Sequence, residues 1–172
     1  MSVIFSVRKY GKAFMFSDTQ KTYGGNNQKR VGCKKLFETE HGILGIVGDD
    51  ESHYDIVRLL SQFDNPFSIT NWPANFDYTV LFINKAGTLY EIDSPGIVSI
   101  QDDAIYASGS GESWAVAAAY GWRLAKGITV SSATDRAIVK LGNCAVSCAI
   151  HHDLHCGGLI ECVTLKTKTT EA

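Results

Sequence analysis

The amino-terminal stretch constrains the fold more than any other, because it has the pattern of a buried β-hairpin. Residues 3–7 and 12–16 are short apolar runs, rich in β-branched and aromatic side chains, and Lys9, Tyr10 and Gly11 separate them. Two such runs on either side of a glycine-bearing turn predict antiparallel strands. A strand that begins at the third residue fixes the start of the chain in space, which a frayed terminus could not do.

The remaining chain alternates between strand patterns and helix patterns. The short apolar runs expected to be strands are residues 34–38, 42–47, 78–84, 88–92, 97–100, 105–108 and 159–165. The stretches whose apolar residues recur at helical spacing are 49–63, 113–125 and 129–148. This order of strands, helix, strands, two helices and strand predicts an α+β fold with antiparallel sheets.

Length and charge limit the classes of function. At 172 residues, we expect one domain spanning residues 1–172, large enough to bury roughly 70% of its unfolded surface. The net charge of −2 provides no field for a polyanion, so we expect no nucleic-acid partner. The sequence has no apolar run long enough for a membrane span and no secretory leader, and we therefore expect a cytoplasmic protein without a membrane partner.

The cysteine and histidine content leaves two alternatives open. Five cysteines is an odd number for a disulfide framework, so we expect reduced thiols. A cluster near the carboxyl end is rich in zinc-ligand types, but its spacing matches no regular zinc motif, and two of its cysteines lie on the apolar face of an expected helix. The cluster consists of Cys144, Cys148, His151, His152, His155 and Cys156.

A glycine-rich segment precedes the second expected helix. Residues 108–111 read Ser-Gly-Ser-Gly, and small residues before a helix can cradle a phosphate. The segment has neither a Walker lysine nor a complete dinucleotide-binding fingerprint. We therefore expect no cofactor.

Ser2 is the candidate nucleophile. Removal of Met1 would leave an α-amine and a hydroxyl on one residue. An α-amine titrates near pH ~8, so it can take the hydroxyl proton itself. Lys35 would lower the pKa of the hydroxyl by its charge, and Asp18 would hold the lysine. The structural alternatives are an ordinary second residue, an exposed strand lysine and a turn aspartate.

These residues carry a resemblance to a known family. The sequence resembles the β-type subunits of the proteasome family, which includes HslV-type peptidases. Ser2, Asp18 and Lys35 match its catalytic positions, and three further segments match in family order: residues 45–49, 106–111 and 153–158. The chain departs from the family at its nucleophile, since Ser-Val replaces the usual Thr-Thr or Thr-Ser pair.

The resemblance implies a fold and a set of roles. The fold is the four-layer α-β-β-α sandwich of the N-terminal-nucleophile (Ntn) hydrolases, with two antiparallel sheets flanked by helices. Ser2 is the nucleophile, Lys35 tunes it and Asp18 positions Lys35. The amide of Gly45 receives the oxyanion, while Ser110 and Asp153 orient the terminal amine and a water. Neither a metal nor a cofactor is implied.

The resemblance also implies a function and partners. It implies a peptidase subunit that cleaves peptides or unfolded proteins inside a homo-oligomeric ring, a hexamer or heptamer that stacks in pairs. An AAA+ unfoldase would feed the ring. Two alternatives remain open: a catalytically inactive ring or assembly subunit, and an Ntn-type amidase.

Overall fold

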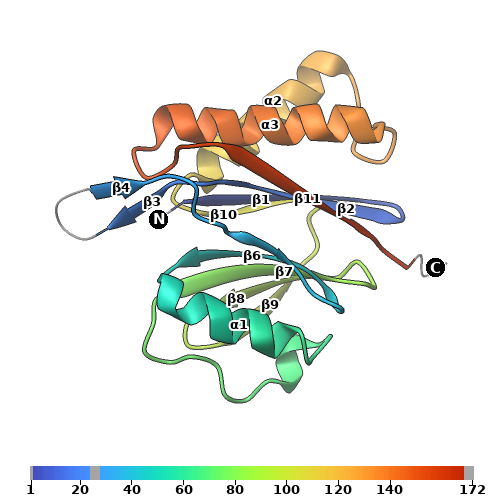
Figure 1. Cartoon of the computed structure of the whole chain (residues 1–172). Helices are drawn as coiled ribbons and strands as arrows, with labels where there is room; N and C mark the ends of the chain where they lie inside the picture. Colours follow the sequence, from blue (N-terminus) through green and yellow to red (C-terminus); the bar gives the residue numbers. More distant parts are fainter. Residues whose placement is uncertain (1, 24–27, 169–172) are drawn as a thin grey trace.

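Two antiparallel sheets lie face to face in the middle of the molecule (Figure 1). The computed structural model describes residues 2–23 and 28–168, so the expected loss of Met1 and the turn residues 24–27 lie outside it. The first sheet has the order β10-β1-β2-β11, and the second has the order β5-β6-β7-β8-β9. The strands of the first sheet are β1 (Val3–Lys9), β2 (Lys12–Asp18), β10 (Ile105–Gly109) and β11 (Ile160–Lys166).

The second sheet contains the strands expected from residues 34 to 100, with small shifts at their ends. They are β5 (Leu36–Glu38), β6 (Gly42–Gly48), β7 (Tyr78–Asn84), β8 (Leu89–Asp93) and β9 (Ile97–Gln101). A separate two-stranded ribbon, β3 (Lys21–Tyr23) with β4 (Gln28–Arg30), was not expected. Its strands are mostly polar and therefore lack the alternation that predicts a strand.

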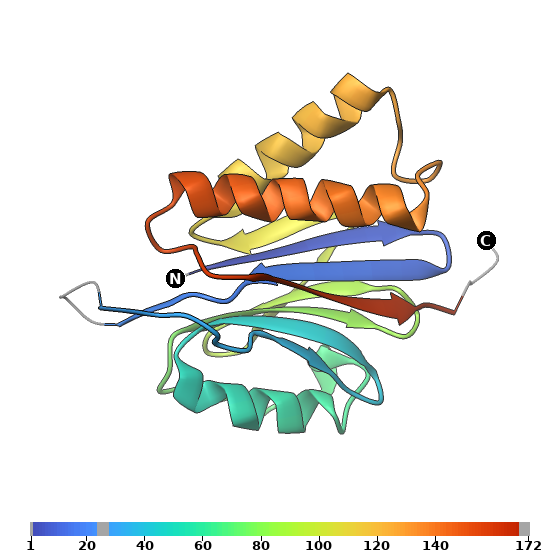
Figure 2. The same cartoon turned by 45° about the horizontal axis from the view of Figure 1, so that its top comes forward.

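Helices cover the outer face of each sheet (Figures 1 and 2). α2 (Glu112–Lys126) and α3 (Asp135–His152) lie on the first sheet. α1 (His53–Leu60) lies on the second, after a 3₁₀ turn at Asp50–Ser52; another 3₁₀ turn is Pro66–Ser68. The expected four-layer sandwich is confirmed. No helix in residues 2–23 and 28–168 is long and apolar enough to cross a membrane.

The third expected helix begins later than its sequence pattern suggested. Thr134 is its N-cap, because its hydroxyl accepts the Ala137 amide at 3.2 Å. The hydroxyls of Thr129 and Ser132 bond within the preceding turn instead, at 2.8 Å. Hydroxyl side chains compete with helical hydrogen bonds in this way, so residues 129–133 stay outside the helix.

Alternation along the first two strands divides the apolar side chains between two layers. Phe5 and Phe16 face α2 and α3, whereas Ile4 and Met15 face the second sheet. A third cluster packs α1 against the outer face of the second sheet. This two-residue alternation fixes which face of each strand packs against the helices and which against the second sheet. The resulting packing brings the start of β1, the end of β2 and the residues before β5 to the same edge.

Candidate active site

Ser2, Lys35 and Asp18 meet at this edge. The Lys35 ammonium lies 2.5 Å from the Ser2 hydroxyl oxygen and 2.7 Å from Asp18 Oδ1. All three are buried, with exposed fractions of 4%, 4% and 0% for Ser2, Lys35 and Asp18. Three of the residues expected from the sequence are therefore in direct contact.

Burial also sets the electrostatics of the lysine. Desolvation lowers the pKa of the Lys35 ammonium below its ordinary value, while the charge and hydrogen bond of Asp18 oppose that shift. The ammonium is therefore closer to releasing a proton than a surface lysine would be. A cation within hydrogen-bond distance of a hydroxyl stabilises the alkoxide form, which makes the hydroxyl a better nucleophile.

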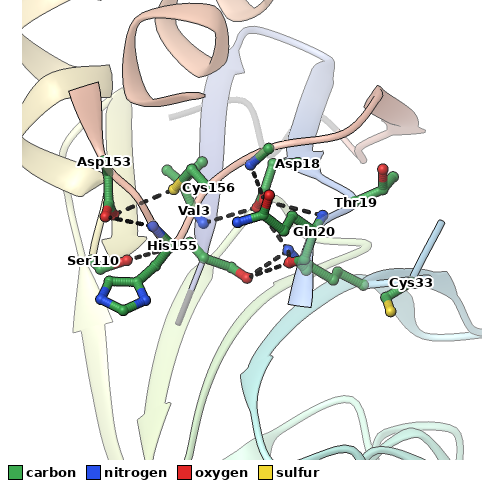
Figure 3. Close-up of polar contacts among 12 residues, drawn as sticks. Val3, Asp18, Thr19, Gln20, Cys33, Ser110, Asp153, His155 and Cys156 are labelled. Carbon is green, nitrogen blue, oxygen red and sulfur yellow. Dashed lines mark hydrogen bonds and ion pairs between the residues drawn. The ribbon is translucent and has the colours of Figure 1, made fainter. Parts of the chain in front are cut away.

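Asp18 uses both of its carboxylate oxygens (Figure 3). Oδ1 accepts the Val3 amide at 3.1 Å in addition to Lys35. Oδ2 accepts the amides of Gln20 and Gly157 at 3.2 and 3.0 Å. Since the three amides come from three separate segments, one carboxylate joins β1, the chain after β2 and the loop after α3.

Gln20 belongs to the site, although no sequence pattern indicated it. Its carbonyl oxygen accepts the Lys35 ammonium at 2.5 Å and the Ser2 hydroxyl at 3.1 Å. Its side-chain amide donates to the carbonyl of Leu154 at 3.1 Å. Because any residue carries a backbone carbonyl, the identity of residue 20 gives no signal for this contact.

Gly45 is not brought to the site. It lies within β6 and pairs with Leu36 on one side and Leu81 on the other. A Cβ at this position would lie 2.7 Å from Ile4 Cγ2 and 3.0 Å from Met15 Sδ. Gly45 therefore allows the two sheets to approach each other, and the role expected for its amide has no geometric basis.

Gly48, at the end of β6, lies near Ser2 and Lys35, which is where the Gly45 amide was expected to lie. It is exposed, it lines a cavity with Ser2 and Lys35, and its φ is +116°. The Ile46 amide donates to the Lys35 carbonyl at 2.9 Å, and amides along a strand alternate in direction, so the Gly48 amide points to the same side. No acceptor for it is found within the described residues.

Ser110 and Asp153 lie on the backbone side of Ser2, away from its hydroxyl contacts. The Ser110 hydroxyl donates to the Ser2 carbonyl at 3.5 Å, and the Gly111 amide does so at 3.4 Å. Burial raises the pKa of Asp153, but hydrogen bonds from Ser110, the His155 amide and the Cys156 thiol outweigh it and lower the pKa (Figure 3). Asp153 is thus an ionised acceptor beside the start of β1.

The loop after α3 is attached to the chain after β2 by further bonds. The Thr19 amide donates to the Gly157 carbonyl at 3.1 Å, and the Thr19 hydroxyl accepts the Leu159 amide at 2.8 Å. Cys156 is buried in this loop, which raises the pKa of its thiol. The zinc alternative has no donor set, because residues 2–23 and 28–168 contain no group of three or more His, Cys, Asp or Glu side chains placed to hold a metal.

A cavity of about 280 Å³ opens beside Ser2. It lies between the ribbon and the end of β6, and it reaches the first turn of α1. The residues that line it are Ser2, Lys21, Thr22, Cys33, Lys35, Ile46, Val47, Gly48, Asp49, Asp50, Glu51, His53 and Asp77. A hydroxyl activated by a lysine, next to a cavity and an unoccupied amide, is an arrangement suited to acyl transfer.

Comparison with known proteins establishes the fold. No protein-family model and no curated protein sequence matches the chain. Among solved structures, eukaryotic HslV from Trypanosoma brucei matches with a TM-score of 0.74 at 20% identity, covering 95% of this chain and 99% of HslV. BPH from Thiobacillus denitrificans matches with a TM-score of 0.70 at 15% identity, covering 98% of this chain and 100% of BPH.

A second structure of BPH, in complex with epoxomicin, matches equally well. Its TM-score is 0.70 at 15% identity, and the match covers 96% of this chain and 99% of BPH. The chain therefore has the fold of HslV and BPH over nearly its whole length. The resemblance noted in the sequence is confirmed at the level of the fold.

Proposed function

We propose that the chain is a peptidase subunit of the N-terminal-nucleophile type, with Ser2 as the nucleophile. The observation that carries this proposal is the contact of the Lys35 ammonium with both the Ser2 hydroxyl and the Asp18 carboxylate. A buried lysine that bridges a hydroxyl and a carboxylate is costly to build for stability alone. The shared fold with HslV and BPH supports the same assignment.

The reaction begins after Met1 has been removed. Ser2 Oγ attacks the substrate carbonyl, and its proton passes to the freed α-amine of the same residue. Lys35 stabilises the hydroxyl oxygen as it becomes negative, and the Gly48 amide receives the oxyanion. The amine then protonates the leaving nitrogen, which leaves an ester on Ser2. Water hydrolyses the ester and regenerates the hydroxyl.

The other contacts in the site hold these groups in place. Asp18 positions Lys35, and the Gln20 carbonyl fixes the ammonium from another direction. Ser110 holds the backbone of Ser2, and Asp153 lies beside it as an acceptor for the α-amine. Serine is an adequate nucleophile because it carries the same hydroxyl as threonine. It lacks the methyl group that restricts χ1.

We extend the proposal to assembly and location on the basis of the family resemblance. The subunit acts in a homo-oligomeric ring, a hexamer or heptamer that stacks in pairs, and an AAA+ unfoldase supplies unfolded protein. By the same resemblance, we propose that the protein acts in the cytoplasm. Particle symmetry measured by electron microscopy, with and without a cross-linker, tests the ring.

The catalytic proposal is tested on the purified protein. Intact-mass spectrometry is expected to show loss of Met1, and peptide cleavage is expected to disappear in Ser2→Ala. Ser6→Ala is the matched control, because Ser6 lies nearby on β1 and is also buried, but its hydroxyl donates to the Tyr106 carbonyl. Epoxomicin, the compound present in the BPH complex, is expected to block cleavage by the wild type. Retained Met1 would favour the alternative of a non-catalytic ring or assembly subunit. Cleavage that survives in Ser2→Ala would remove Ser2 from the mechanism.

A further inference from the structure

The cavity beside Ser2 has an uneven lining. Next to the hydroxyl, the lining includes Cys33, Ile46 and Val47, and the last two have their side chains buried in the core. The turn that follows β6, together with the residue that precedes β7, contributes carboxylates. These are Asp49, Asp50, Glu51 and Asp77, all of which are exposed.

The carboxylates outnumber the cations of the cavity. Lys21 is paired with Asp50 at 2.6 Å, and the charge of Lys35 is balanced by Asp18 at 2.7 Å. The other basic group in the described wall is His53, and burial lowers the pKa of its imidazole below the ordinary value of 6.5. His53 is therefore neutral at pH 7, and the cavity keeps a negative charge.

The acidic turn is held in a fixed shape. Asp49 Oδ2 accepts the Asp77 amide at 3.1 Å, and the Asp49 amide donates to the Asp77 carbonyl at 2.8 Å. The Ser52 hydroxyl donates to the Asp49 carbonyl at 2.7 Å. These bonds position the Asp49 carboxylate and the backbone of the turn without a ligand, which reduces the ordering cost when a charged side chain binds.

We propose that this cavity receives a lysine or arginine side chain of the substrate, on the residue whose carbonyl Ser2 attacks. The inference rests on the proposed function. Lysine and arginine each carry a terminal cation on a long stem, and that cation is complementary to the carboxylates of the turn. An acidic side chain in the same position would be repelled by the carboxylates, so the cavity discriminates by charge.

A matched substrate series tests the inference. Three fluorogenic peptides differ only in the residue before the scissile bond, which is arginine, leucine or glutamate. We expect kcat/KM for the arginyl peptide to exceed that for the leucyl peptide by about tenfold, which is a difference of about 1.4 kcal/mol. The glutamyl peptide is expected to be the poorest. The ratio of arginyl to leucyl cleavage should shrink as salt is added, because the carboxylates are exposed.

Removing carboxylates from the cavity tests whether they cause the preference for arginine. The double variant Asp49→Asn with Glu51→Gln keeps the side-chain sizes and an acceptor for the Asp77 amide. Its ratio of arginyl to leucyl kcat/KM is expected to fall several-fold. Asp64→Asn, an exposed carboxylate that does not line the cavity, is the control and should leave the ratio unchanged. Equal or better cleavage of the leucyl peptide by the wild type would overturn the inference while leaving the peptidase proposal intact.

A binding experiment separates failure of the inference from failure of the proposed function. Fluorescence anisotropy measures the affinity of the Ser2→Ala protein for labelled arginyl and glutamyl peptides. Tighter binding of the arginyl peptide supports the charged cavity, even if the wild type cleaves no substrate. Equal affinities would overturn it.

Discussion

The ammonium of Lys35 donates to the hydroxyl of Ser2 at 2.5 Å, although 33 positions separate the two residues. They meet because Ser2 precedes the strand β1 of the first sheet, while Lys35 precedes the strand β5 of the second. The contact therefore depends on the packing of one sheet on the other. Substitutions at the site are therefore expected to affect catalytic activity and the stability of this packing to different degrees.

Lys35→Met should reduce activity more than stability. Asp18 would keep three backbone donors after the change, so its charge stays satisfied, and we expect a loss of about 1–3 kcal/mol in the free energy of unfolding. Loss of the activating cation should lower kcat by at least about 10²-fold. Urea unfolding and peptide cleavage measure the two effects. An active Lys35→Met variant would remove Lys35 from the mechanism.

Asp18→Asn should be the more destabilising substitution. An asparagine has one acceptor oxygen, whereas Asp18 accepts three amides and an ammonium through two oxygens. The Lys35 ammonium would also lose its carboxylate partner, and we expect a cost of about 3–5 kcal/mol. The exposed Asp64→Asn is the matched control. Hydrogen exchange at Gly157 should accelerate in Asp18→Asn alone.

Gly45→Ala and Gly48→Ala should differ in what they affect. The Cβ of Gly45→Ala meets Ile4 and Met15, so it should cost about 1–3 kcal/mol of stability, with kcat per folded molecule little changed. The Cβ of Gly48→Ala would meet the Asp77 carbonyl at 2.1 Å and must move the backbone, so kcat should fall. Parallel measurements of unfolding and kcat decide between them. A large loss of kcat confined to Gly45→Ala would restore the oxyanion role to Gly45.

Ser2→Thr should remain active and should raise kcat slightly. The added methyl group restricts χ1, and selecting one of three staggered rotamers limits the gain to about threefold. Ser2 is buried, so the expected gain requires that the methyl group fits without displacing the hydroxyl. Steady-state kinetics on one peptide provides the comparison. A Thr variant with a much lower kcat would indicate that the pocket around the nucleophile is shaped for serine.

His53 should make the protein less stable in mild acid. Burial lowers its pKa below 6.5, so the unfolded chain binds the proton at a higher pH than the folded protein does. Stability should therefore fall as the pH drops from about 6.5 toward the folded pKa, by at most about 1.4 kcal/mol per pH unit for one proton. Urea unfolding of wild type and His53→Gln between pH 7.5 and pH 5 measures the difference. A steeper loss in His53→Gln would contradict the assignment.

The sequence predicted the fold well where apolar side chains recur at a clear strand or helix spacing. The opening hairpin is confirmed, with Phe5 paired to Phe16, and the helix at Glu112–Lys126 ends at Gly127 in the left-handed conformation. The ribbon strands Lys21–Tyr23 and Gln28–Arg30 were missed because their sequences are mostly polar and show no strand alternation. Hydroxyl-rich residues 129–133 fit a helix or its cap equally well, and only the observed hydrogen bonds distinguish them.

The candidate site was predictable only in part. The resemblance named Ser2, Asp18 and Lys35, and the structure brings them into contact. It named Gly45 because that glycine matches the family's oxyanion position, and a sequence match does not show which amide points away from a neighbouring strand. Strand register places Gly45 between β5 and β7 and leaves Gly48 beyond the end of β5, which is the basis for proposing Gly48. Gln20 acts through a carbonyl that every residue has, so no sequence pattern could indicate it.

The attachment of the loop after α3 to Asp18 and Thr19 has a consequence during synthesis. A chain still on the ribosome and ending before residue 153 would lack the Gly157 amide, the Leu154 carbonyl and the edge strand β11. Its first residues could not yet be held in the geometry described above. The Ser2 site of a nascent chain would therefore stay unassembled until residues 153–166 had emerged, so any activity of this site would begin only after the first sheet is complete.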